Sequence, residues 1–190
     1  EISIAKQVTS LRLMDRKIAT EIRYLHEPRQ TAKLVTYLDS LGYVKVPGKE
    51  IQNPRKMKQG TYTFGCQLES TQENGEILQN PVDVILMPFS DANDMLPIFI
   101  EAKSMTDKAN PNKRQKEEGK KIQNLRRRWQ RPEGEEGKNQ EDPFIYVIEV
   151  GGTIPKRYLE TEENQGIDWF FEDRPEDLDV LLDWYLSLPT

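Results

Sequence analysis

The sequence has very few of the side chains that build disulfides and zinc sites. It contains one cysteine, Cys66, and one histidine in 190 residues. A single cysteine cannot form an internal disulfide, and nothing in its usage indicates an oxidising compartment. A zinc finger or an all-His/Cys zinc centre is excluded for this chain alone, because such sites need several nitrogen or sulfur ligands.

Long apolar runs are also missing. Apolar residues make up 36% of the chain and charged residues 31%, and no stretch approaches the ~18–20 apolar residues of a membrane span. The N-terminus does not resemble a signal peptide. We therefore expect a cytoplasmic protein with no membrane contact. The length of 190 residues is enough for one domain with a real core.

The net charge of −5 conceals a sharp asymmetry. The segment Lys108–Arg131 holds ten Lys or Arg residues and two acidic ones, which leaves the rest of the chain strongly acidic, above all from Glu160 to Asp183. An acidic protein can still bind a polyanion through one dense basic segment, because the local field matters more than the total charge.

The order of the expected elements indicates an α/β fold with a mixed central β-sheet flanked by helices. Apolar spacing predicts helices over residues 4–26, 29–41, about 112–129 and from about 175 onward. Strands are expected over residues 43–46, 61–69, 77–87, 96–102 and 144–150. The last of these is apolar apart from Glu149, which is typical of a strand buried on both faces.

Two of these apolar strands carry charged residues where a core strand should have none. Asp83 lies in the first of them, and the second ends in Glu101-Ala102-Lys103. Because strand side chains alternate between faces, Glu101 and Lys103 point the same way, and Asp83 lies opposite them if the two strands form a hairpin. Buried charges cost several kcal/mol unless they pair or hold a metal. The cluster therefore predicts a divalent-metal site.

Asp83, followed 18 positions later by Glu101-x-Lys103, resembles the PD-(D/E)xK nuclease signature, although Pro81 stands two positions before the aspartate rather than next to it. Both parts fall on consecutive expected strands, ahead of a basic helix, which is the order of the common core of that superfamily. The alternative is a purely structural role, in which Glu101 and Lys103 form a solvent-exposed pair on an edge strand and Asp83 starts a turn. It explains neither Asp83 nor the basic helix.

Further positions resemble type II restriction endonucleases of the XamI kind. The similarity covers roughly residues 80–180. The matching positions are Ile100–Ser104, Asp107, Asn110, Asn112–Arg114, Lys116–Glu118, Gln123, Leu125, Arg126, Tyr158, Leu159, Glu163, Gly166–Trp169, Asp177 and Leu178.

This resemblance implies a restriction-endonuclease-like core and Mg²⁺-dependent cleavage of double-stranded DNA at a short specific sequence. A type II site-specific deoxyribonuclease is expected to act as a homodimer, since two strands need two active sites. The resemblance also implies a bacterial or archaeal cytoplasm. One nuclease domain is expected over residues 1–190. The chain begins with Glu rather than Met, so it is read either as that domain alone or as the C-terminal catalytic part of a longer chain.

The resemblance also assigns roles at the metal site. Asp83 and Glu101 would supply carboxylates and Ala102 its carbonyl oxygen, as hard ligands for Mg²⁺. Lys103 would orient the attacking water and offset charge on the phosphoryl oxygens. Many relatives carry an extra Glu on the helix before the first strand, for which Glu21 and Glu27 are the candidates. A solvated helix charge is the alternative for both.

The basic segment supplies the candidates for DNA contact. Three consecutive arginines cover nearly a full helical turn, which favours phosphate contact over mere solvation. Residues just beyond the catalytic strand are expected to reach the phosphate backbone or the base edges, and the sequence does not separate these roles. The candidates are Asn112, Lys113, Arg114, Lys116, Lys120, Arg126, Arg127 and Arg128.

Two other functional readings stay open. One is another nuclease of the same superfamily, such as a nickase, a repair nuclease or a junction resolvase. The other is a DNA-binding module that kept the fold and lost catalysis, against which the intact set of Asp83, Glu101 and Lys103 argues.

Overall fold

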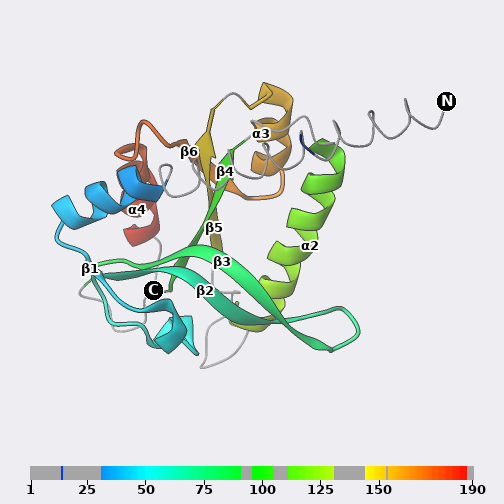
Figure 1. Ribbon diagram of the computed structural model, residues 1–190, viewed down its shortest axis with the longest axis horizontal. Coiled ribbons are helices and arrows are strands. Elements are labelled where there is room, and N and C mark those ends of the chain that lie inside the picture. Colours follow the sequence, from blue (N-terminus) through cyan, green and yellow to red (C-terminus); the bar gives the residue numbers. More distant parts are fainter. Residues whose placement is uncertain are drawn as a thin grey trace.

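The computed structural model describes Met14 and residues 31–90, 96–104, 111–130, 144–152 and 154–187. The helix expected over residues 4–26 lies outside these residues, Met14 apart. Residues 31–40 form a helix, as expected. The described part contains a six-stranded sheet in the order β1-β2-β3-β4-β5-β6, so each strand lies beside its neighbours in sequence (Figure 1).

The sheet is mixed, as the sequence predicts. The short β1 (Val44–Lys45) runs parallel to β2 (Thr61–Thr71), and β2, β3 (Ile77–Met87) and β4 (Ile98–Ser104) form an antiparallel meander. β4, β5 (Ile145–Gly151) and β6 (Asp168–Phe171) are parallel to one another. Parallel neighbours need a crossover connection. α2 (Pro111–Trp129) lies in the crossover from β4 to β5, and α3 (Lys156–Glu163) lies in the crossover from β5 to β6.

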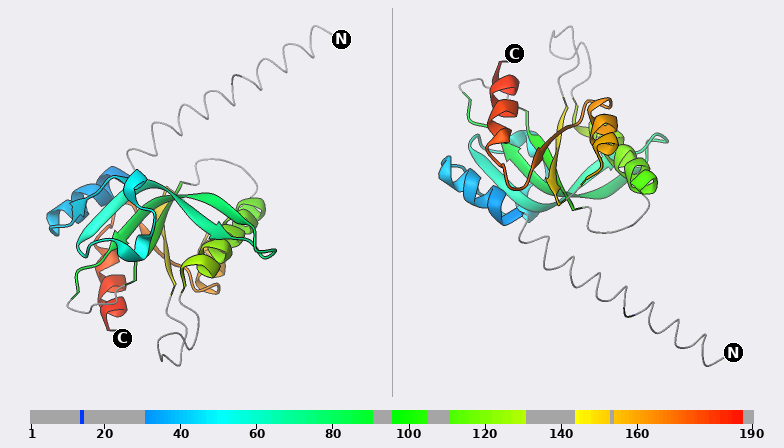
Figure 2. Two further views of the ribbon diagram at one scale, coloured as in Figure 1. Left: turned by 90° about the horizontal axis from the view of Figure 1, so that it is seen from below. Right: turned by 90° about the horizontal axis from the view of Figure 1, so that it is seen from above.

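Helices cover both faces of the sheet (Figure 2). On one face, α2 and α3 pack in an α2-side layer to which Ile122 and Leu125 belong. On the other, the helix over residues 31–40 and α4 (Asp177–Leu186) pack in an α4-side layer that contains Leu38 and Leu178. β5 alternates between them: Tyr146, Ile148 and Val150 belong to the α2-side layer, Ile145 and Val147 to the α4-side layer. The prediction of a strand buried on both faces is therefore confirmed.

Along the β2–β3 hairpin, the side chains on one face of the strands pass from one core layer to the other. Near the middle of the sheet, Val84 of β3 belongs to the α4-side layer, but Val82, two residues earlier, belongs to the α2-side layer. β2 changes in the same way between Phe64 and Cys66, across Gly65, whose φ of 64° is left-handed. The register places Gly65 across from Asp83, so the change falls at the level of Asp83. Strong local twist of this kind re-aims the side chains beside it.

Several short elements differ from the sequence-based expectations. α3 and β6 have no counterpart among the predicted elements, because eight and four residues are too few to establish a periodic apolar pattern. Two single-turn 3-10 helices, η1 (Gly48–Glu50) and η2 (Pro54–Lys56), lie between β1 and β2, where the sequence predicts neither a helix nor a strand. Within the described residues, no helix has the length and apolar character needed to cross a membrane.

A matched pair of leucines tests the α4-side layer. Leu38 is fully buried, whereas Leu41, three residues later, is 41% exposed. We expect Leu38→Ala to lower the free energy of unfolding by about 2–5 kcal/mol, because it leaves a cavity in the packed layer. Leu41→Ala should cost less than about 1 kcal/mol. Urea denaturation followed by circular dichroism measures both. Equal losses would show that residues 31–40 do not pack as described.

Candidate active site

The candidate site forms where β3 and β4 part. Their pairing ends at Val84 and Ile100. Beyond that pair, the side chain of Asp83 takes the place of the ladder: its Oδ2 accepts a hydrogen bond from the backbone N–H of Ala102 at 2.9 Å. Buried backbone donors need an acceptor, and this one binds Asp83 to the start of the Glu101-Ala102-Lys103 segment. The expected hairpin pairing of the two strands is confirmed.

Glu101 and Lys103 lie on the same side of β4, as strand alternation predicts, and face α2. Lys103 Nζ donates to Glu101 Oε1 at 2.9 Å and lies 2.5 Å from Glu118 Oε2 on α2. Lys121, one helical turn further on, donates to Glu101 Oε2 at 2.5 Å. The result is a compact ion-pair network in which each oxygen of Glu101 meets an ammonium group.

Tyr146 of β5 also belongs to this network. Its hydroxyl donates to Glu118 Oε1 at 2.7 Å and lies 3.3 Å from Glu101 Oε2. Glu101 and Glu118 are only 8% and 7% exposed. Buried charges of this kind are tolerated only when they are paired and hydrogen-bonded, and these contacts meet that condition.

The two acidic residues of the motif have opposite pKa shifts. Burial, and then the negative charge of Glu101, raises the pKa of Asp83 to about 6, against the opposing effects of the Ala102 N–H and the two lysines. Burial also acts to raise the pKa of Glu101, but the charges of Lys103 and Lys121 outweigh it and lower that pKa. Glu101 is therefore the firmly ionised member of the pair, and Asp83 is the one that a nearby positive charge would stabilise most.

Lys103 stays protonated in this arrangement. Burial acts to lower its pKa, but the charges of Glu101 and Glu118 and their hydrogen bonds raise it overall. Burial and the same two carboxylates raise the pKa of Tyr146 well above its ordinary value. At neutral pH the site thus offers an ammonium group and a neutral phenol. Neither is suited to remove a proton, and the ammonium is suited to stabilise negative charge.

The donor set fits a hard divalent cation. Asp83 and Glu101 interact electrostatically across the opening between β3 and β4, and the Ala102 carbonyl belongs to the same segment. Mg²⁺ takes oxygen ligands, is held by one or two carboxylates and keeps several waters. Within the described residues no group of three or more His, Cys, Asp or Glu side chains could hold a metal. Two carboxylates and a carbonyl are oxygen ligands of the kind that Mg²⁺ takes.

Glu149 is a further buried acid beside this site. It is fully buried on β5, in register with Ala102 of β4. Burial, then the charges of Glu172 and Asp83, raises its pKa to about 8, against the opposing charge of Lys33. At neutral pH Glu149 is mostly protonated, so it adds little negative charge next to Asp83.

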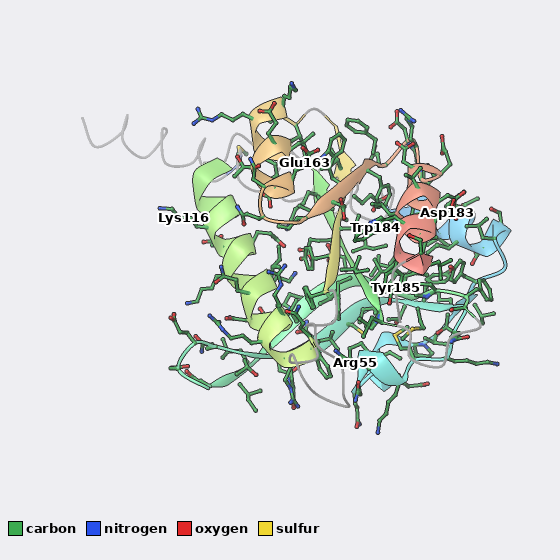
Figure 3. All side chains as sticks on the ribbon, turned by 180° about the vertical axis from the view of Figure 1, so that it is seen from behind. Arg55, Lys116, Glu163, Asp183, Trp184 and Tyr185 are labelled. Carbon is green, nitrogen blue, oxygen red and sulfur yellow. The ribbon has the colours of Figure 1, made fainter. Side chains whose placement is uncertain are left out.

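The other candidate residues lie in different places. Glu21 and Glu27 fall outside the described residues, as do the side chains of Asn112, Lys113 and Arg114 in the first turns of α2. Lys116 and Lys120 are exposed on α2, and Lys116 points away from the sheet (Figure 3).

The three arginines end α2 and begin five residues after Lys121, the last helix residue of the ion-pair network. Arg126 lies over the Phe144 ring at 5.7 Å, and Arg128 pairs with Glu69 at 2.9 Å. Arg127 is exposed and donates to Asn124 at 3.1 Å. These contacts give Arg126 and Arg128 roles within the fold, and phosphate contact by the triplet stays a prediction.

The sequence analysis assigned no site role to Glu118, Lys121 or Tyr146, although Glu118 is one of the positions that match the family pattern. Glu118 falls on the apolar stripe of α2, four residues before Ile122 and seven before Leu125. A charged residue on an otherwise apolar helix face indicates a buried partner. In the dense basic segment this signal was hidden by the charges on the solvent side.

These features together define a class of protein. A mixed sheet covered by helices on both faces, with two acids and a lysine where its second and third long strands part, is the architecture of a restriction-endonuclease-like core. The family model described as XamI restriction endonuclease matches residues 1–171. The chain belongs to the XamI restriction endonuclease family, which confirms the resemblance found in the sequence.

One curated relative extends this comparison. The chain is 31% identical over 160 residues to the type II restriction enzyme SalI of Streptomyces albus G. The matched segment covers 84% of this chain and 46% of the relative, so the chain spans about half the length of the protein it matches. No solved structure matches the chain.

The raised pKa of Glu149 predicts a pH-dependent stability. Its pKa rises from 4.5 to about 8 on folding, so the folded state holds a proton that the unfolded state releases between these values. Stability should therefore fall as the pH rises through this window, by an amount on the order of a few kcal/mol. Glu149→Gln mimics the protonated form. It should match wild type near pH 4.5 and become progressively more stable than wild type up to pH 8.

Urea denaturation in EDTA at a series of pH values measures this difference. Glu73→Gln, at an exposed position in the β2–β3 turn, is the matched control and should follow the wild-type curve. If the Glu149→Gln curve also runs parallel to wild type, then Glu149 is ionised in the folded protein.

Proposed function

We propose that this chain is the catalytic part of a type II restriction endonuclease, which hydrolyses phosphodiester bonds of double-stranded DNA at a short specific sequence with Mg²⁺. The observation that carries the proposal is the convergence of Asp83, Glu101 and Lys103 where β3 and β4 part. Family membership supports it, and the matched relative is itself named as a type II restriction enzyme.

Asp83, Glu101 and the Ala102 carbonyl would hold the metal ion. Mg²⁺ bound there would supply Lewis-acid stabilisation of the phosphoryl oxygens and favour deprotonation of the attacking water. The geometry explains why these residues suit the task. The hydrogen bond to the Ala102 N–H fixes the direction of the Asp83 carboxylate. The raised pKa of Asp83 marks a position where a cation relieves unfavourable charge.

Lys103 would act on the phosphate as a fixed positive charge. We propose no general-base role for it, because two carboxylates hold its amine as an ammonium group. An ammonium group held by two carboxylates is already oriented, so it stabilises the charge that develops in the transition state without reorganising. The proton of the attacking water must therefore go to another acceptor, such as solvent or a phosphate oxygen.

The DNA would lie along the exposed side of α2. Lys116 and Lys120 are exposed there, on the same helix as the network that orients Lys103. Cleavage of both strands of a duplex requires two active sites, and we propose a homodimer with twofold symmetry to supply them. A DNA substrate of this kind is found in the bacterial or archaeal cytoplasm, which is the proposed location.

Three substitutions test the proposed chemistry. Asp83→Asn keeps an acceptor for the Ala102 N–H but removes the charge, and Glu101→Gln removes the second carboxylate. Both should abolish cleavage with Mg²⁺, while binding to cognate DNA in Ca²⁺ stays within about threefold, because the proposed phosphate contacts of α2 do not involve these two carboxylates. Lys103→Ala should lower the single-turnover rate by about 100-fold or more, because the ammonium acts on the transition state.

Glu117→Gln is the control for these variants. Glu117 is exposed beside Glu118 on α2 and should cleave at the wild-type rate. Wild-type cleavage by Asp83→Asn or Glu101→Gln would remove the proposed metal site. Products restricted to nicks at branched or damaged DNA would favour another nuclease of the superfamily, and DNA binding without cleavage by wild type would favour a module that has lost catalysis.

A salt titration tests the DNA-binding face. Lys116, Lys120 and Arg127 are exposed on α2. If they contact phosphates, replacing all three with Gln should weaken binding to specific and random DNA alike. It should also make the log–log salt dependence shallower by up to roughly 0.9 for each lost contact. Preference among cut sites should persist, because phosphates carry no base identity.

A second triple variant removes the same charge elsewhere. Lys49, Lys56 and Lys58 are exposed in and beside η1 and η2, and replacing them with Gln should leave the salt slope as in wild type. An equal change of slope in both variants would mean that the effect comes from total charge rather than from the α2 face.

A further inference from the structure

Glu118 has contacts that point to a role of its own. It is the carboxylate on α2 that faces the strands, and it is 7% exposed. Both of its oxygens are engaged: Oε2 lies 2.5 Å from Lys103 Nζ, and Oε1 accepts the Tyr146 hydroxyl at 2.7 Å. The phenol therefore fixes the rotation of the carboxylate, and the carboxylate in turn meets the lysine.

Lys103 has two carboxylate acceptors, Glu101 and Glu118, and only Glu101 is also a proposed metal ligand. A lysine side chain has four rotatable bonds, and holding its ammonium in one direction needs fixed acceptors. Glu101 is one acceptor, at 2.9 Å, but it is also a proposed metal ligand and already shares its other oxygen with Lys121. A carboxylate that shares its charge with a cation attracts an ammonium group less strongly. Among the described residues, Glu118 has no second ammonium partner, and it is not a proposed metal ligand.

We infer that Glu118 is the positioning residue for Lys103. It holds the Lys103 ammonium in place together with Glu101 in the metal-free protein, and it continues to do so when Glu101 is engaged with the metal. Tyr146 keeps Glu118 oriented for this task. Glu118 acts through Lys103 and touches neither the substrate nor the metal. The inference deepens the proposed nuclease function and rests on it for its kinetic consequences, whereas the effect of Glu118 on Lys103 itself does not depend on that function.

The first test therefore needs neither metal nor DNA. Lys103 is labelled with acetic anhydride in the metal-free protein, and the modified fraction is measured by peptide mass spectrometry. Because ion pairing protects an amine, Glu118→Gln should raise the labelling rate of Lys103 by about threefold or more. Lys156, which is 89% exposed on α3, should label equally in all variants. Unchanged labelling of Lys103 would overturn the inference.

The second test separates positioning from metal binding. With saturating Mg²⁺, Glu118→Gln should lower the single-turnover cleavage rate by about tenfold or more, while DNA binding in Ca²⁺ stays within about twofold. The Mg²⁺ concentration for half-maximal rate should not change. A variant whose rate returns to wild type at high Mg²⁺ would show that Glu118 is a metal ligand, which would overturn the inference. A rate within about twofold of wild type would show an ion pair of structural importance only.

Three further variants keep the result decisive. Glu118→Asp restores the charge on a shorter side chain and should recover part of the rate and of the protection of Lys103. Tyr146→Phe removes one hydroxyl from the packed core and should show the same effects as Glu118→Gln, but smaller ones. If Glu118→Gln does not fold, Tyr146→Phe takes its place in both tests. Glu117→Gln controls for loss of an acidic residue from α2.

Wild-type protein in the same assays separates the two claims. If wild type cleaves DNA and Glu118→Gln cleaves equally well, the inference fails and the nuclease proposal stands. If wild type cleaves no DNA under any condition, the nuclease proposal fails, and the labelling of Lys103 alone decides whether Glu118 holds the lysine.

Discussion

The hydrogen bond from the Ala102 N–H to Asp83 Oδ2 is the interaction on which the candidate site depends. β3 and β4 pair as far as Val84 and Ile100 and then separate. A buried backbone donor without an acceptor costs about 1–3 kcal/mol, and Asp83 supplies the acceptor. The same bond fixes a carboxylate beside the Glu101 to Lys103 segment. The separation of β3 and β4 and the position of the Asp83 carboxylate are therefore coupled through this hydrogen bond.

Helix α2 is fixed to the sheet by polar contacts as well as apolar ones. Its C-terminal end is held because the Trp129 indole N–H donates to the Glu69 carbonyl at 2.7 Å and Arg55 donates to the Trp129 carbonyl. In its middle, Glu118 and Lys121 enter the site on the face that also buries Ile122. Because buried ion pairs are directional, they set the rotation of the helix in a way that apolar packing alone does not.

Much of the fold, and the proximity of Asp83, Glu101 and Lys103, could be predicted from the sequence. Strand alternation placed Glu101 and Lys103 on one side, and the hairpin pairing brought Asp83 to the same segment. The partners from α2 were out of reach, because the basic segment looks like a solvated or DNA-binding face until the depth of Glu118 in the layer is known. Glu149 was seen only as a polar interruption of an apolar strand. Its neighbours Asp83 and Glu172 come from other strands or turns, and such long-range proximity leaves no local signal. α3 and β6 were too short to show periodicity.

The most direct test of the account is to digest plasmid DNA of random sequence with the wild-type chain and Mg²⁺, and to sequence both ends of every fragment. If the chain is a type II restriction endonuclease, all ends should map to one short sequence, cut in both strands, and EDTA should prevent their formation. Ends scattered over the plasmid, nicks confined to one strand, or cutting that persists in EDTA would contradict it.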